Sequence, residues 1–257
     1  MVEQLICINV QLFLFFRKLM NSSSIKKSIQ IGLFSVASYL VVTSVVMFFY
    51  NGGDRFDPAR SSYNFFGSFL SDLGRMHEFS GLTSYTTGTV YALALGFMGI
   101  GAILFFLAHY YLVPGAKNIL KWPASIIGLI AGVSDIGIAC TPWDIYPKAH
   151  LVFVFTRFIS FSVTCMCMFL IVIGHSTYPN TFGFVYLFLC ILNISYILFM
   201  TLGPDSEDPW GRIVQATGQK IVIYTQSMLI IYCAYGALRV AAKIREENNP
   251  NNLQSSE

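Results

Sequence analysis

Long runs of apolar residues dominate the chain, and most polar residues fall between them. Six runs approach the roughly 20 residues that an α-helix needs to cross the hydrocarbon core of a bilayer. They cover residues of about 30–50, 88–111, 123–140, 151–174, 182–202 and 221–241. The stretches between them leave no room for a soluble domain. The pattern therefore predicts an all-α, polytopic membrane protein in which residues 30–241 form a bundle of six transmembrane helices.

Composition agrees with a membrane location. The 257 residues are 55% hydrophobic and 11% charged, against about 25% charged in an ordinary soluble domain. So few charges do not cover a water-facing surface, whereas a helix in hydrocarbon satisfies its own backbone hydrogen bonds and needs no polar face. The net charge of +3 includes no long single-sign run, which argues against a nucleic-acid partner. The expected partner is the lipid bilayer.

The distribution of lysine and arginine predicts the orientation. One side of the predicted bundle holds Arg17, Lys18, Lys26, Lys27, Lys117, Lys121, Arg239, Lys243 and Arg245, and the other holds Arg55, Arg60, Arg75, Lys148, Arg212 and Lys220. By the positive-inside rule the first side is cytoplasmic. We therefore expect a protein of the cell membrane with a cytoplasmic N-terminal segment over residues 1–29 and a disordered cytoplasmic tail over 242–257. The apolar run 5–16 is too short to span, so it lies at the interface or precedes a true start at Met20.

The first extracytoplasmic segment, residues 51–87, contains a helical pattern from Tyr63 to Gly74. Its polar face carries Asn64, Ser68, Ser71 and Asp72, and phenylalanine and leucine side chains cover much of the other face. This pattern predicts an extracytoplasmic interfacial helix. Its polar face either meets water or turns Asn64, Ser68 and Asp72 toward the other outer segments, 141–150 and 203–220.

Two ionisable residues fall inside predicted spans. Counted from the loop between the third and fourth spans, Asp135 and Arg157 lie at nearly the same depth, roughly 8–10 Å below the surface at 1.5 Å per residue. A charge in hydrocarbon normally has a partner or a wet cavity. We therefore predict an Asp135–Arg157 ion pair between adjacent antiparallel helices, which either fixes the helix register or binds an anionic group.

Further polar residues lie on helix faces near the same side. His150 precedes Arg157 by seven residues and shares its face; an interfacial histidine of this kind is more often a packing residue than a ligand or base. Gln215, Gln219 and Gln226 form a stripe in the sixth span, either an interhelical hydrogen-bond seam or the wall of a site.

Other chemistry is not indicated. The sequence lacks a P-loop, a dinucleotide-binding glycine motif, a nucleophile elbow and H-E-x-x-H. Consecutive residues on a helix point in different directions, so the run Cys165-Met166-Cys167-Met168 predicts packing rather than a copper site. Gly96, Gly99 and Gly128-x-x-x-Gly132 predict close helix contacts.

The segment Asn64-Phe65-Phe66-Gly67-Ser68-Phe69-Leu70-Ser71-Asp72-Leu73-Gly74, followed by Pro142, Asp144 and His150, resembles a family of six-helix prokaryotic membrane proteins, domain of unknown function 998. The resemblance covers roughly residues 30–240. It implies a six-helix fold and a membrane location but no activity.

A more distant similarity is to the alkaline ceramidase and adiponectin-receptor group of membrane hydrolases, which bind zinc through three histidines with a serine and an aspartate. The residues that fit such a set are Ser68, Asp72, Asp135, His77 and His150. The paired H-x-x-x-H of that group is absent and the sixth span has no histidine, so we predict no metal site.

Three functions follow as hypotheses. The first is a protein with an outer-leaflet cavity that accepts a lipid headgroup or small polar molecule. The cavity is expected to be lined by Asn64, Ser68, Asp72, Asp135, His150, Arg157 and Gln219. The alternatives are a membrane-embedded lipid hydrolase that uses Asp72 or His150 as acid or base, and a small-molecule transporter built around the Asp135–Arg157 pair.

Overall fold

The computed structural model describes residues 22–83, 85–113, 118–175 and 178–247. The N-terminal apolar run lies outside the described residues, as do residues 248–257 of the tail predicted over 242–257, whereas residues 242–247 of that tail are the last residues of a helix.

Six long helices and one short one make up the described chain. They are α2 (Ser22–Phe49), the 3-10 helix η1 (Leu70–Gly74), α3 (Tyr85–Leu112), α4 (Asn118–Cys140), α5 (Pro147–Val172), α6 (Asn180–Leu202) and α7 (Pro209–Glu247). All six α-helices are long and apolar enough to cross a membrane. The predicted all-α fold with six spans is confirmed.

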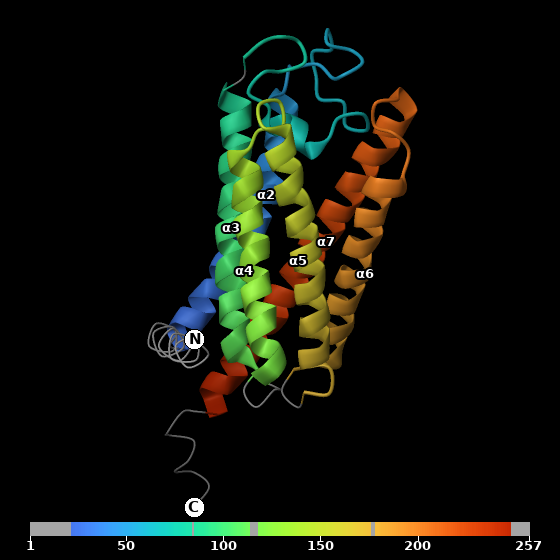
Figure 1. The fold of residues 1–257 in the computed structure, drawn as a ribbon. Coiled ribbons are helices and arrows are strands. Elements are labelled where there is room, and N and C mark those ends of the chain that lie inside the picture. Colours follow the sequence, from blue (N-terminus) through green and yellow to red (C-terminus); the bar gives the residue numbers. More distant parts are fainter. Residues whose placement is uncertain (1–21, 84, 114–117, 176–177, 248–257) are drawn as a thin grey trace, which may run out of the picture.

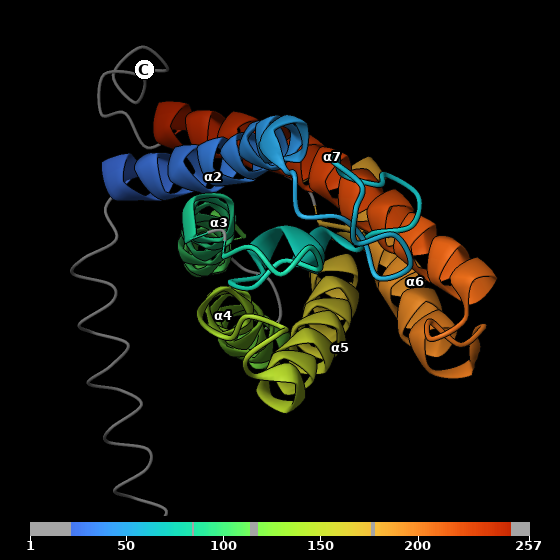
Figure 2. The same ribbon diagram turned by 90° about the horizontal axis from the view of Figure 1, so that it is seen from above.

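The helices run alternately up and down and form a ring (Figure 1). Each packs on its neighbour in sequence from α2 to α6, and α7 packs on both α6 and α2, which closes the ring (Figure 2). The segments 50–83, 141–146 and 203–208 lie at one end, which we call the loop end. The first turns of α2 and the last turns of α7 lie together at the opposite end, which we call the terminal end (Figure 1).

The last helix is much longer than the hydrophobic pattern indicated. α7 begins at Pro209 rather than near residue 221 and continues to Glu247. Proline is well suited to the first turn of a helix because its missing N–H is unpaired there in any case. The first turns are polar because they line the loop end, so hydropathy alone does not reveal them as helix.

The interfacial helix predicted from Tyr63 to Gly74 is shorter than expected. Only Leu70–Gly74 is helical, and the residues before it form a turn. The Asn64 side chain accepts a hydrogen bond from the Gly67 N–H at 3.0 Å and donates one to Asp54 at 2.8 Å. Such side-chain to backbone bonds compete with helix formation. η1 itself is buried rather than lying on the membrane, since Leu70 and Leu73 are almost fully enclosed and η1 sits over the middle of the ring (Figure 2).

Of the predicted close glycine contacts, that between Gly99 and Gly132 holds α3 against α4, whereas Gly96 makes no close contact. A Cβ atom at Gly99 would lie 2.6 Å from the Gly132 carbonyl oxygen, and a Cβ at Gly132 would lie 2.7 Å from the Gly99 oxygen. The two backbones therefore touch at this point. Small residues commonly mediate such an approach between membrane helices, where dispersion contacts rather than hydrophobic burial drive association.

We expect Gly99→Ala to destabilise the bundle by about 1–3 kcal/mol, because the added methyl group forces the two helices apart. Gly96→Ala is the matched control on the same helix, since its Cβ would meet Ala139 at an ordinary 3.9 Å. Reversible unfolding of the purified protein in detergent measures both. Equal stability of the two variants would contradict the close contact.

Candidate functional site

A cleft opens at the loop end between α5, α6, η1 and the first turns of α7. Its volume is about 500 Å³, within the range typical of small-molecule sites. Polar groups come from η1, α7 and the segment 203–208, together with Arg55 and with His150 of α5, and apolar groups come mainly from α5 and α6. The lining side chains on which the site depends are Asp72, His150, Arg212, Gln215 and Gln219 on the polar side, and Leu151, Val154, Phe155 and Met200 on the apolar side.

An ion pair attaches η1 to α7 along one wall of the cleft. Arg212 donates from Nη2 to Asp72 Oδ2 at 2.8 Å and from Nε to the Gly67 carbonyl oxygen at 3.0 Å. Asp72 also accepts the Phe69 N–H at 2.7 Å. Burial raises the pKa of the Asp72 carboxyl above its usual value, and the Arg212 guanidinium opposes that rise. The pair is therefore a desolvated charge pair whose members depend on each other.

Two further residues of α7 hold the same segment. Gln219 accepts the Leu70 N–H through Oε1 at 2.7 Å, and the buried Lys220 ammonium donates to the Ser68 carbonyl oxygen. Gln215 binds instead at the C-terminal end of α6. Its side-chain amide donates to the carbonyl oxygens of Phe199, in the last turn, and Pro204, just after the helix, at 3.1 Å each. The glutamine stripe predicted from the sequence thus connects α7 to its neighbours and presents Gln215 and Gln219 to the cleft.

His150 occupies the first turns of α5, where it is buried. Its Nδ1 lies 2.7 Å from the Thr141 carbonyl oxygen, so Nδ1 carries a proton, and the ring meets Trp143 edge to face at 5.6 Å. Fixing the donor at Nδ1 leaves Nε2 as the acceptor of a neutral ring. The residue combines the packing role expected from the sequence with a place in the cleft wall.

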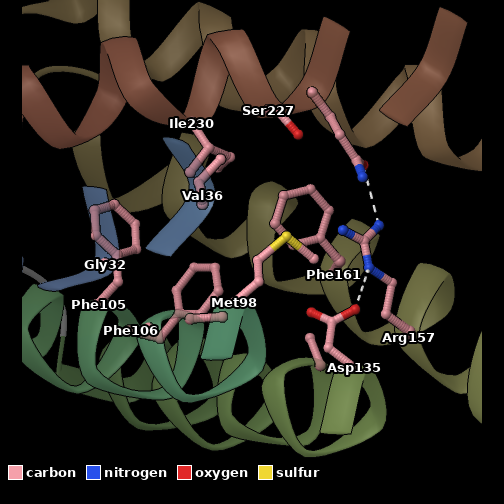
Figure 3. A pocket seen from close by; sticks show the side chains of 14 residues that line it. Gly32, Val36, Met98, Phe105, Phe106, Asp135, Arg157, Phe161, Ser227 and Ile230 are labelled. Carbon is pink, nitrogen blue, oxygen red and sulfur yellow. Dashed lines mark hydrogen bonds and ion pairs between the residues drawn. The ribbon is translucent and has the colours of Figure 1, made fainter. Parts of the chain in front are cut away.

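The predicted Asp135–Arg157 ion pair is present, deeper in the bundle than the cleft. Arg157 Nε donates to Asp135 Oδ1 at 3.2 Å, as Figure 3 shows. Its Nη1 reaches Gln226 Oε1 at 3.0 Å and Asn193 Oδ1 at 3.5 Å. Gln226, which the sequence placed in a hydrogen-bond seam or a site wall, and Asn193 are therefore partners of Arg157, and the network joins α4, α5, α6 and α7.

The structure divides the seven predicted site residues into three groups. Asp72, His150 and Gln219 line the cleft. Asp135 and Arg157 line smaller cavities below it. Asn64 lies in the turn before η1, and Ser68 is fully buried beneath the loop, so neither lines the cleft.

Arg212 was missed as a site residue because it lies before the predicted sixth span. A signal for it exists in the sequence: Arg212, Gln215 and Gln219 are spaced three and seven residues apart, which places them on one helical face. Extending the helix back to the proline at 209 would have brought all three together.

Within the described ranges, no three histidine, cysteine, aspartate or glutamate side chains gather as metal ligands. No family model, curated protein or solved structure matches the chain. The site's geometry is therefore the basis for the function proposed below.

We expect Asp72→Asn or Arg212→Gln alone to cost about 3–5 kcal/mol, because each leaves a buried charge without its partner, and the double variant to cost clearly less than the sum. Unfolding of the four proteins in detergent forms a double-mutant cycle. Glu207→Gln is the control, since the Arg55–Glu207 pair is exposed and is worth only about 0–1 kcal/mol. Strictly additive costs would show that the two charges do not interact.

A second carboxylate fixes the loop before α3. Asp144 accepts the N–H groups of His77 at 2.8 Å and Met76 at 3.2 Å. Burial raises the pKa of the Asp144 carboxyl, but these donors bind its charged form and bring the pKa below the usual value of 3.8. The contact therefore contributes stability above the unfolded pKa and loses it as the pH falls through the lower folded value.

Hydrogen exchange of residues 75–83 should accordingly accelerate below about pH 4, after correction for the intrinsic rate. Asp144→Asn is expected to show the accelerated exchange already at pH 7. Exchange in this segment that is unaffected by the substitution would mean that other contacts hold the loop.

Proposed function

We propose that this multi-pass membrane protein binds a lipid in the loop-end cleft, with the headgroup on the polar wall and the acyl chains along α5 and α6. The observation that carries this proposal is the division of one cleft into a polar wall and an apolar wall. Ligand sites typically combine such an apolar lining with a few placed polar groups. A lipid has the same division within one molecule.

The position of the cleft supports lateral access from the bilayer. Leu151 lines the cleft and is 42% exposed, and the adjacent Val152 is 63% exposed on the outer surface of α5. Since α5 is a membrane-spanning helix, these side chains meet lipid. An acyl chain thus has an apolar route from the bilayer into the cleft.

The contacts in the polar wall favour binding over hydrolysis. Asp72, one predicted acid or base, is committed to Arg212, and His150 is oriented by a backbone carbonyl rather than by a carboxylate. A hydrolase that works through a side-chain nucleophile needs a base beside that nucleophile. We assign a headgroup phosphate to Arg55, which lines the cleft and whose exposed pair with Glu207 is worth little, because a guanidinium group binds phosphate through paired hydrogen bonds.

We further propose that the loop end is extracytoplasmic, in the cell membrane, with both termini cytoplasmic. The sequence places nine lysine and arginine residues on the side of the termini and six on the side of the loop end, and the positive-inside rule assigns the side with the excess to the cytoplasm. We also propose membership of the domain of unknown function 998 family, on the basis of residues 64–74 together with Pro142, Asp144 and His150.

Filling the cleft tests the proposal without removing a charge. We expect dioctanoyl phosphatidylglycerol to stabilise the wild-type protein, by about 2.7 kcal/mol at a hundred times its dissociation constant. Val154→Trp, which places a large ring in the cleft, should abolish that gain. Val152→Trp is the matched control on the lipid-facing side of α5 and should keep it.

The same experiment separates the lipid from its headgroup. Glycerol phosphate should stabilise far less than the lipid, because it lacks the acyl chains. Equal stabilisation of both tryptophan variants by the lipid would show that it acts outside the cleft and would overturn the proposal.

A further inference from the structure

Two smaller cavities continue the cleft toward the centre of the bundle. The first has a volume of about 50 Å³ and shares Ser71, His150 and Gln219 with the cleft wall. The second, about 40 Å³ and drawn in Figure 3, shares Met98, Asp135 and Arg157 with the first. The three spaces therefore follow one another from the loop end to the buried ion pair.

The size of the inner cavities limits what occupies them. A water molecule in a cavity needs roughly 10–15 Å³ of volume that its centre can occupy. Each inner cavity thus has room for a few water molecules. Neither has room for a lipid headgroup.

Polar atoms without protein partners face this inner space. Asp135, Arg157 and Ser227 are 4%, 7% and 4% exposed, so bulk water does not reach them across the outer surface. Figure 3 shows the second carboxylate oxygen of Asp135 and the third guanidinium nitrogen of Arg157 pointing into the cavity, with Ser227 at its edge. Among the described residues these atoms make no hydrogen bond, whereas buried polar groups are normally paired with protein or ordered water.

The far part of the deeper cavity is apolar. Phe105, Phe106, Ala131 and Ile230 line it, and they offer no polar partners to a water molecule. The polar path therefore leads to the ion pair from the loop end and stops there.

We propose that a file of water molecules runs from the cleft, past Ser71, His150 and Gln219, to the Asp135–Arg157 pair. The pair is then a hydrated polar site in the membrane interior with access from one side only. Water satisfies the free oxygen of Asp135 and the free nitrogen of Arg157, which lowers the cost of holding both charges in hydrocarbon. This inference does not depend on lipid binding.

Two buried methionines allow a direct test in the unmodified protein. Met98 lines both inner cavities, whereas Met168 belongs to the apolar core; the two are 7% and 3% exposed. Radiolysis of bound water produces hydroxyl radicals that oxidise the nearest thioether. After brief mixing with ¹⁸O-labelled water, we expect Met98 to be oxidised several-fold faster than Met168 and to carry ¹⁸O in its sulfoxide.

The entry route is tested by Ser71→Leu, with Ser71→Ala as the control that does not fill space. The leucine should lower the oxidation rate of Met98 several-fold and leave Met168 unchanged, whereas the alanine should leave both unchanged. Should the leucine variant fail to fold, the ¹⁸O measurement on the wild-type protein still decides whether exchangeable water reaches the pair.

Equal, slow oxidation of Met98 and Met168 in the wild-type protein would overturn the proposal, because the inner cavities would then be dry. Oxidation of Met98 without ¹⁸O would also overturn it, because the water would be sealed in. Unchanged oxidation in a folded Ser71→Leu variant would exclude entry from the cleft.

Discussion

The need to pair every buried charge in a medium without water governs the inner structure of this protein. Two ion pairs meet that need at different depths, Asp135–Arg157 within the bundle and Asp72–Arg212 at the loop end. A buried pair contributes little net stability compared with apolar residues of the same volume, but removal of one partner is costly. Such pairs therefore fix which helices and loops face each other rather than adding much to the free energy of folding.

The loop-end cleft is a consequence of how those partners are distributed. Arg212, Gln219 and Lys220 on α7 all bind η1 or the turn before it. This holds the loop over the centre of the ring and keeps one face of α7 polar. The side chains that α5 and α6 turn toward the cleft are mostly apolar, with His150 and Thr201 as the polar ones. A cleft with one wall of each kind results.

Much of this arrangement follows from the sequence, and the rest does not for identifiable reasons. The six spans can be predicted because a helix in hydrocarbon consists of an unbroken run of apolar residues. The Asp135–Arg157 pair can be predicted because the depth of a residue in the membrane can be counted along its helix. The turn at Asn64 was misread because the spacing of Asn64, Ser68 and Ser71 also fits one face of a helix. Only the bond from Asn64 to Asp54, ten residues earlier, decides between the two structures. Arg212 was missed because hydropathy does not report the polar first turns of a helix.

The central claim is that a lipid occupies the cleft between α5, α6 and α7. Photo-crosslinking with a diazirine-bearing phosphatidylglycerol, followed by mapping of the labelled peptides, tests it most directly. The structure predicts labelling of Leu151 to Phe155 and of the last turns of α6 that excess unlabelled lipid removes. Labelling spread evenly over the outward faces of the helices, and unaffected by competitor, would contradict it.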